Sequence, residues 1–196
     1  MKRLVAICGY PQVGKSEVQD LIAARYGFTP IDDGRPLRDA AKHLYNLDEW
    51  HVSTQEGKAS EILVGTRYRT VRDLLGELGC YLERDDPYHL PRIALEKAMI
   101  DDPEGRFVFG SVRLDQPRFF KCRGDALIVE VRRAGTSATT TSDCYERDMI
   151  DVTIENTPDM TRPDASRRAL AASVAEALDP LLAPPSLAGD VFATAL

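Results

Sequence analysis

A glycine-rich segment between a short apolar run and an amphipathic stretch constrains the fold of this chain more than any other feature. Residues 9–16 are Gly-Tyr-Pro-Gln-Val-Gly-Lys-Ser and match the pattern GxxxxGK[ST]. The apolar run from Leu4 to Cys8 before it predicts a buried strand, and residues 15–26 after it predict a helix. A phosphate-binding loop (P-loop) requires this strand–loop–helix context. The glycines let backbone N–H groups approach a phosphate closely, and the helix N-terminus adds partial positive charge.

The side chains of this loop predict how it would hold ATP. Lys15 is expected to reach the β- and γ-phosphates as a catalytic residue, and the Ser16 hydroxyl is expected to ligate Mg²⁺. The expected ATP-binding residues of the loop are Gly9, Pro11, Gln12, Val13, Gly14, Lys15 and Ser16. A glycine-rich turn that only joins a strand to a helix is the alternative interpretation, but all four fixed positions of the motif match.

Apolar runs of strand length alternate with amphipathic stretches along the rest of the chain. This pattern predicts an α/β protein: a three-layer P-loop sandwich with a mostly parallel five-stranded sheet and helices on both faces. Strands are expected at 4–8, 28–31, 107–112, 126–131 and 150–154, and helices at 15–26, 36–45, 70–84, 88–101, 116–122 and 164–182.

The whole chain, residues 1–196, is expected to form a single domain. We expect an acceptor-binding insertion at about 34–101, in which 46–68 is polar and irregular. We also expect a lid at about 132–148, containing a flexible loop, and a frayed tail from 184.

Composition and length exclude several classes of P-loop protein. The 31 acidic and 25 basic residues give a formal net charge of −6, the opposite sign to that of most proteins bound along nucleic acid. The chain lacks the NKxD motif of regulatory GTPases, and 196 residues are too few for a large motor ATPase. No apolar run reaches the ~18 residues that a membrane helix needs, and the four cysteines form no CxxC pair. We therefore expect a cytoplasmic protein with reduced thiols and without a membrane or nucleic-acid partner, and a homodimer remains open.

Seven segments, in their order along the chain, carry a family resemblance. They are GYPQVGKS at 9–16, DDGRPLR at 32–38, QEGK at 55–58, TVRDLLGELG with Arg84 at 70–84, FVFGSVR at 107–113, VEVRR at 129–133 and DVTIEN at 151–156. This order resembles that of the phage-type deoxynucleoside monophosphate kinases, P-loop enzymes that are related to dephospho-coenzyme A kinases. Outside the P-loop, the shared order is more specific than any single segment.

The resemblance implies roles for residues beyond the P-loop. The residues that it places in the acceptor site are Asp33, Arg35, Lys58, Arg72, Arg84 and Arg113. An acceptor monophosphate carries close to two negative charges at neutral pH, which arginine binds bidentately. Arg132, at the start of the lid, is expected to act catalytically by stabilising the transferring phosphoryl group. Asn156 is expected near the nucleotide base, and its alternative is a turn or cap residue.

The chain also departs from the family pattern. Ser111 stands where relatives usually have aspartate, and Gly79-Cys80-Tyr81 replaces Gly-Thr-Glu. The sequence thus predicts ATP- and Mg²⁺-dependent phosphorylation of a deoxynucleoside monophosphate to the diphosphate. One alternative is transfer to a hydroxyl of a nucleoside, a dephospho-coenzyme A-like molecule or a modified base in DNA, with Asp33 as general base. The other is a nucleotide-binding module without catalysis.

Overall fold

The computed structural model describes residues 2–138, 144–159 and 161–182, and its centre is a five-stranded sheet. The strand order is β2-β5-β1-β6-β7, and all four pairings are parallel. The strands are β1 (Leu4–Cys8), β2 (Thr29–Ile31), β5 (Phe107–Phe109), β6 (Ala126–Arg132) and β7 (Val152–Glu155). The predicted fold class is therefore confirmed.

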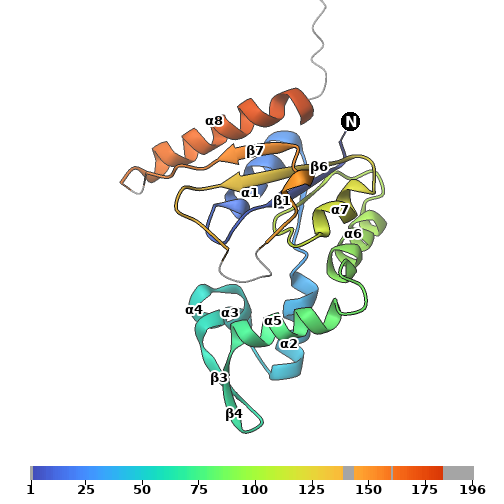
Figure 1. Ribbon diagram of the computed structural model, residues 1–196, viewed down its shortest axis with the longest axis vertical. Helices are drawn as coiled ribbons and strands as arrows, with labels where there is room; N and C mark the ends of the chain where they lie inside the picture. Colours follow the sequence, from blue (N-terminus) through green and yellow to red (C-terminus); the bar gives the residue numbers. More distant parts are fainter. Residues whose placement is uncertain (1, 139–143, 160, 183–196) are drawn as a thin grey trace, which may run out of the picture.

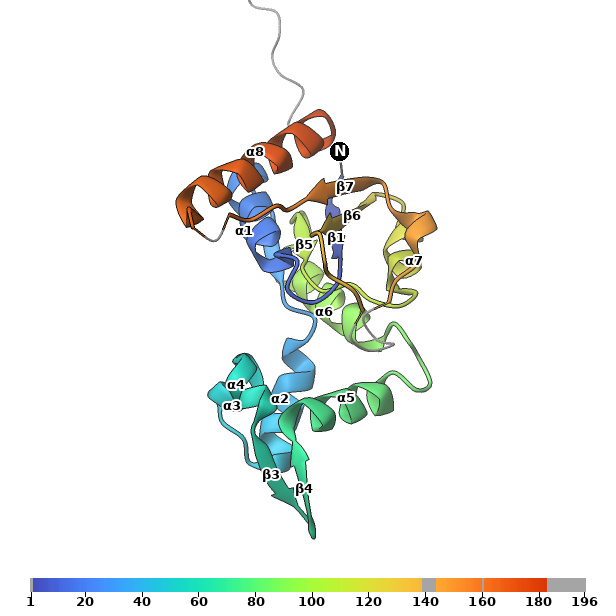
Figure 2. The same ribbon diagram turned by 60° about the vertical axis from the view of Figure 1, so that its left-hand side comes forward.

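Helices cover both faces of the sheet. Helices α1 (Lys15–Tyr26) and α8 (Pro163–Leu182) pack on one face, and α6 (His89–Asp101) and α7 (Gln116–Lys121) pack on the other (Figures 1 and 2). Side chains along β1 alternate between the two apolar layers, so that each layer receives part of the strand. Because both faces are buried, β1 is apolar throughout, as in other parallel sheets.

A smaller layer stands apart from the sheet, in the lower part of Figure 1. Its elements are α2 (Arg35–Tyr45), α3 (Glu49–Ser53), α4 (Gln55–Ala59), β3 (Glu61–Val64), β4 (Arg67–Thr70) and α5 (Val71–Leu82). Leu47, Val52 and Val71 form a separate apolar cluster inside it. Helix α6, which the sequence assigns to this insertion, instead packs on the sheet through Leu95 and Ala98. The layer that stands apart therefore ends with α5.

The prediction of an irregular segment at 46–68 is wrong, because short elements fill most of it. The Asp48 side chain accepts a hydrogen bond from the His51 N–H (3.1 Å), and Thr54 Oγ1 accepts one from the Gly57 N–H (2.9 Å), which begins α3 and α4. Strands β3 and β4 pair antiparallel across a two-residue loop that contains Gly65 at φ 62°. Elements of four or five residues are too short to show a hydrophobic period.

Part of the predicted lid is anchored rather than open. The Leu114 carbonyl accepts a hydrogen bond from the Glu146 N–H (3.1 Å), and the Arg118 side chain pairs with Glu146 (2.7 Å). A short 3₁₀ helix, η2 (Arg147–Met149), follows. The lid residues 139–143 and the tail from 184 lie outside the described residues.

Among the described residues, no helix has both the length and the apolar character that crossing a membrane requires.

Candidate functional site

The P-loop connects β1 to α1 at the carboxyl end of the central strand. Gly9 and Gly14 have φ angles of 148° and 97°, which residues with a side chain rarely adopt. A Cβ at Gly9 would lie 2.5 Å from the Val131 carbonyl oxygen, and one at Gly14 would lie 2.4 Å from Asn156 Nδ2. Both glycines are therefore required by their conformation and by the close approach of their neighbours.

The start of α1 is suited to bind an anion. Within the described residues, no side chain caps the helix at Gly14, so the first N–H groups remain available to a phosphate. Lys15 Nζ donates hydrogen bonds to the carbonyl oxygens of Gly9 and Tyr10, both at 2.8 Å. These bonds hold the ammonium group over the loop, where the charge of a bound triphosphate would lie.

Asn156, directly after β7, contacts the P-loop. Its buried side chain donates from Nδ2 to the Val13 carbonyl oxygen (2.8 Å), and its backbone N–H donates to the Arg132 carbonyl oxygen (2.7 Å). The structure thus places the amide of Asn156 on the backbone of the loop, where it shapes the phosphate site. Its predicted position near a nucleotide base remains a prediction.

Four cations from four parts of the chain lie close enough for their charges to interact, and we call them the basic cluster: Arg38 of α2, Lys58 of α4, Arg72 of α5 and Arg113 after β5. Burial lowers the pKa of Lys58, and the charges of Arg38, Arg72 and Arg113 lower it further. The Val112 N–H donates to the Ile7 carbonyl oxygen (3.0 Å), which holds the chain at Arg113 against the P-loop strand. Because like charges oppose one another here, a bound dianion would relieve a repulsion already present.

The sequence predicts three of these four cations as acceptor residues and misses Arg38. The side chain of Arg38 is only 23% exposed and pairs with Asp32, whereas that of Arg35 is 78% exposed and pairs with Asp39. Both arginines belong to the segment DDGRPLR, and the orientation of α2 decides which one turns inward. Both arginines line a polar surface depression of about 290 Å³ together with Asp32.

Arg84 is also not brought into the basic cluster. It lies beyond the end of α5, pairs with Asp85 (3.2 Å) and stacks over Tyr81. Arg72 lies in the first turn of the same helix, where its Nη2 donates to Gln55 Oε1 (2.7 Å). The two arginines are 12 residues apart, which corresponds to roughly 18 Å along a helix, so one phosphate cannot contact both.

Two carboxylates, Asp33 and Glu83, interact next to Arg113. Burial raises the pKa of Asp33 to about 6, although the charge of Arg113 opposes the shift. Burial and the charge of Asp33 raise the pKa of Glu83 to about 7. Gln116 orients the group, since its Nε2 donates to Glu83 Oε1 (3.3 Å) and its Oε1 accepts from the Arg113 N–H (3.0 Å). Nothing in the sequence pattern distinguishes Glu83 from a solvated helix residue.

The raised pKa of Glu83 predicts a pH-dependent difference in stability. Its ordinary value is 4.5 and its folded value is about 7, so the folded state binds this proton more tightly than the unfolded chain. The resulting stabilisation is fully present below the unfolded pKa and is lost as the pH rises through the folded pKa. The substitution Glu83→Gln removes this loss. The free energy of unfolding of the variant, relative to wild type, should therefore increase from about pH 5 to about pH 8.

Urea unfolding of both proteins at the two pH values measures this difference. Carboxylates with a lowered pKa, such as Asp179 at about 2, contribute equally to both proteins and cancel. Glu104→Gln, on the exposed surface, is the matched control and should show no such increase. A constant difference between wild type and Glu83→Gln would contradict the raised pKa.

The oxygen donors of the site fit Mg²⁺. Ser16 is exposed in the first turn of α1, and Asp33 supplies a carboxylate at the end of β2. Ser111 accepts a hydrogen bond from Arg113 Nη2 (3.3 Å). The described residues contain no group of three or more histidine, cysteine or acidic side chains that would form a metal site by themselves. Mg²⁺ is commonly held by one or two protein oxygens together with substrate phosphates and water.

The two arginines at the start of the lid have different partners. Arg132 pairs with the buried carboxylate of Glu130, with 2.7 Å between Nε and Oε2. Arg133 Nη1 donates to the Gln12 carbonyl oxygen of the P-loop (3.2 Å). The Arg133 guanidinium therefore contacts the P-loop, whereas that of Arg132 lies beside Glu130, which the sequence alone does not single out.

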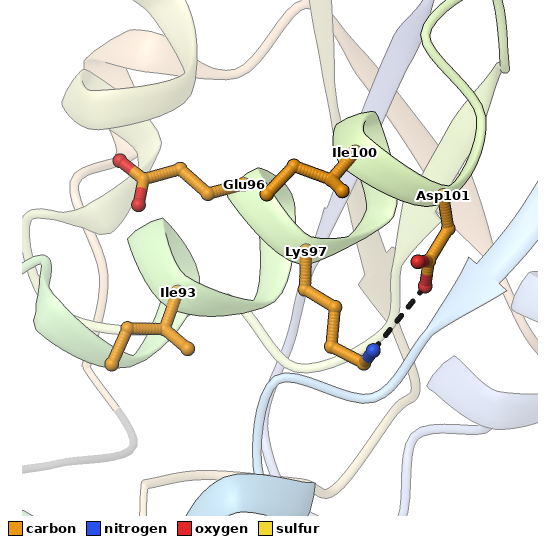
Figure 3. A pocket seen from close by; sticks show the side chains of 5 residues that line it. All are labelled: Ile93, Glu96, Lys97, Ile100 and Asp101. Atoms are coloured by element: carbon orange, nitrogen blue, oxygen red, sulfur yellow. Dashed lines mark hydrogen bonds and ion pairs between the residues drawn. The ribbon is translucent and has the colours of Figure 1, made fainter.

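A separate surface depression of about 300 Å³ lies on α6, away from these groups (Figure 3). It is lined by Ile93, Glu96, Lys97, Ile100 and Asp101, and Lys97 donates to Asp101 (3.3 Å) across it. None of the predicted site residues belongs to it.

Comparison with known proteins finds similarity only among solved structures. No protein-family model matches the chain, and no curated protein matches it significantly. A dephospho-CoA kinase from Campylobacter jejuni is 13% identical, with a TM-score of 0.42 and coverage of 90% of this chain and 98% of its own. A sugar kinase from Janibacter sp. HTCC2649 is 16% identical, with a TM-score of 0.40 and coverage of 94% and 97%. TT1252 from Thermus thermophilus is 19% identical, with a TM-score of 0.41 and coverage of 89% and 97%.

Proposed function

We propose that this chain transfers the γ-phosphoryl group of ATP to a deoxynucleoside monophosphate. The observation that carries the proposal is the basic cluster, which offers a second site suited to an anion and meets the sheet at Arg113. The P-loop follows β1, Arg113 follows the adjacent strand β5, and Asp33 follows β2 on the other side of β5. The carboxyl ends of parallel strands form one edge, where ligands of open α/β sheets bind.

The two sites divide the charges of the reactants between them. The P-loop with Lys15 binds the triphosphate, and the basic cluster binds the monophosphate of the acceptor. An acceptor phosphate oxygen attacks the γ-phosphorus while the bond from that phosphorus to the bridging oxygen breaks, which leaves ADP. The attacking oxygen is already ionised at neutral pH, so the protein contributes positioning and charge neutralisation. Bound Mg²⁺, held by Ser16, would neutralise charge on the triphosphate.

The basic cluster and the acid pair together favour a nucleotide as acceptor. Arg113 interacts with both, since its charge acts on the pKa of Lys58 and on those of Asp33 and Glu83. In this arrangement the phosphate of the acceptor pairs with the basic cluster, and the carboxyl groups accept hydrogen bonds from its sugar or base. The deoxynucleoside itself is suggested by the order of sequence motifs.

One observation supports transfer to a hydroxyl instead. Asp33 is buried, and its pKa is raised to about 6, which suits a general base that removes a hydroxyl proton near neutral pH.

A single assay of ADP release separates the possibilities. Purified protein is mixed with MgATP and, in turn, with each deoxynucleoside monophosphate, each nucleoside, dephospho-coenzyme A and a DNA oligomer. The proposal predicts ADP release that depends on a monophosphate. ADP release only with a hydroxyl acceptor would contradict the proposal and support transfer to a hydroxyl. ATP binding without any ADP release would indicate a nucleotide-binding module without catalysis.

Substituting Asp33 by asparagine tests the role of its carboxylate. The variant keeps the shape of the side chain and removes the base. With a monophosphate acceptor we expect a loss of about tenfold in kcat/KM, equivalent to one hydrogen bond. With a hydroxyl acceptor, loss of the base would lower kcat by ~10²–10⁴-fold and remove the acidic limb of the pH–rate profile. Steady-state rates over a range of pH values distinguish the two, and Asp32→Asn is the matched control.

A further inference from the structure

Glu130 is a fully buried carboxylate beside the strand that carries the P-loop. It lies near the end of β6, directly opposite Cys8 of β1, and its exposure is 0%. The other residues of β6 up to Val131 are apolar. A buried charge is costly unless it is paired and hydrogen-bonded, so a specific set of partners must hold this one.

Four side chains provide those partners, and two of them are arginines that flank the lid. Oε2 of Glu130 lies 2.7 Å from Arg132 Nε and accepts a hydrogen bond from Thr153 Oγ1 (3.2 Å). Oε1 accepts one from the Tyr145 hydroxyl (2.7 Å) and lies 3.7 Å from Arg147 Nε. The predicted lid begins at Arg132, and Tyr145 and Arg147 lie near its end, so this one carboxylate contacts residues at both ends of the predicted lid.

The returning segment also contacts the P-loop. Arg147 Nη2 donates to the Tyr10 hydroxyl (3.1 Å), and the Tyr10 and Tyr145 rings lie 5.8 Å apart. Tyr10 is the second residue of the P-loop motif. Through these contacts Glu130 fixes the positions of Arg132 and Arg147 relative to the phosphate site.

The contact with Glu130 leaves much of the Arg132 guanidinium accessible. The Arg132 side chain is 47% exposed although its partner is fully buried. A guanidinium carries five N–H donors, and the closest approach to Glu130 uses Nε. The remaining edge of the group is accessible to a phosphoryl group that transfers at the P-loop.

We propose that Glu130 is a positioning residue: it holds the guanidinium of Arg132 in the orientation that stabilises the transferring phosphoryl group. The inference rests on the proposed function. A charged group that is oriented before the reaction stabilises the transition state without reorganisation. Without Glu130, the long side chain of Arg132 would have to be ordered during each turnover.

The test is a double-mutant cycle of Glu130→Gln and Arg132→Ala. Glutamine keeps the size of the side chain but replaces one carboxylate oxygen by an N–H donor, and that donor cannot pair with an arginine. We expect Glu130→Gln to lower kcat by ~10–10²-fold with little change in the acceptor KM, because orientation in the transition state is lost. In the Arg132→Ala background the same change should have almost no effect on kcat. Glu104→Gln, which changes an exposed carboxylate outside this network, is the control and should keep near-normal kcat.

Equal losses from Glu130→Gln in both backgrounds would show a structural role alone and overturn the proposal. Circular dichroism and thermal unfolding of the four proteins show whether a loss of activity follows from a loss of folding. Dissociation constants of MgATP are measured on the same proteins, so that the cycle can be evaluated even if wild type phosphorylates no acceptor. In that case the proposed function fails. Coupling of at least threefold in MgATP affinity would then still support the positioning of Arg132, and additive affinities would overturn it.

Discussion

Lys15→Ala should lower the rate of phosphoryl transfer by ~10³-fold or more and leave the fold intact, because a charge that stabilises the transition state is removed. In the structure, the Lys15 ammonium is held over the loop by the carbonyl oxygens of Gly9 and Tyr10. Both hydrogen bonds are only partly buried, so water can replace the ammonium group after the substitution. Alanine also suits the first turn of α1, since it has the highest helix propensity.

Turnover of MgATP with the best acceptor, measured together with circular dichroism, tests this expectation. Lys97→Ala is the matched control, since Lys97 lies on the exposed surface of α6 away from the P-loop (Figure 3). The control should retain wild-type kcat. Near-normal kcat in Lys15→Ala would mean that the loop is not a catalytic P-loop, even though its backbone conformation fits a phosphate.

Arg72→Ala should raise the acceptor KM by ~10–10²-fold and change the ATP KM little. Arg72 belongs to the basic cluster, and one charged hydrogen bond to a phosphate contributes about 1.5–3 kcal/mol. Arg84→Ala should have less than about a threefold effect, as expected for a surface ion pair. Both arginines lie in the segment 70–84, and the structure shows that they have different partners.

Initial rates with varied acceptor at saturating ATP, and then with varied ATP, give the two KM values. Equal effects of Arg72→Ala on both KM values would remove Arg72 from the acceptor site. A larger effect for Arg84→Ala than for Arg72→Ala would mean that the acceptor binds at the far end of α5, and the basic cluster would then have another role.

Segments with a strong local signal are predicted well from the sequence. The P-loop, the strand before it and the helix after it occur at their expected positions, with β1 at Leu4–Cys8 and α1 at Lys15–Tyr26. Their apolar runs are long enough to set a period, and glycine at positions 9 and 14 is required by local geometry. The hairpin β3–β4 has only four residues in each strand. Strands this short do not show a hydrophobic period in the sequence.

Residues that act through distant partners are not predicted in this way. Glu130 appears as one polar residue in an apolar strand, and Glu83 as one of many acids on helices. Each becomes distinctive only through its neighbours, which are Arg132, Tyr145 and Thr153 for Glu130 and Asp33 and Gln116 for Glu83. Burial beside a specific charge depends on how separate elements pack.

The sequence by itself determined that this chain forms a parallel α/β sheet with a phosphate-binding loop, because hydrophobic period and glycine geometry are local properties. The tertiary structure decided which cations come together. It places Arg38 rather than Arg35 and Arg72 rather than Arg84 in the basic cluster, according to how α2 and α5 are oriented within the smaller layer. The physical reason is that a charge binds a phosphate only within a few ångströms, and residues from four separate elements reach that distance only after the chain has folded.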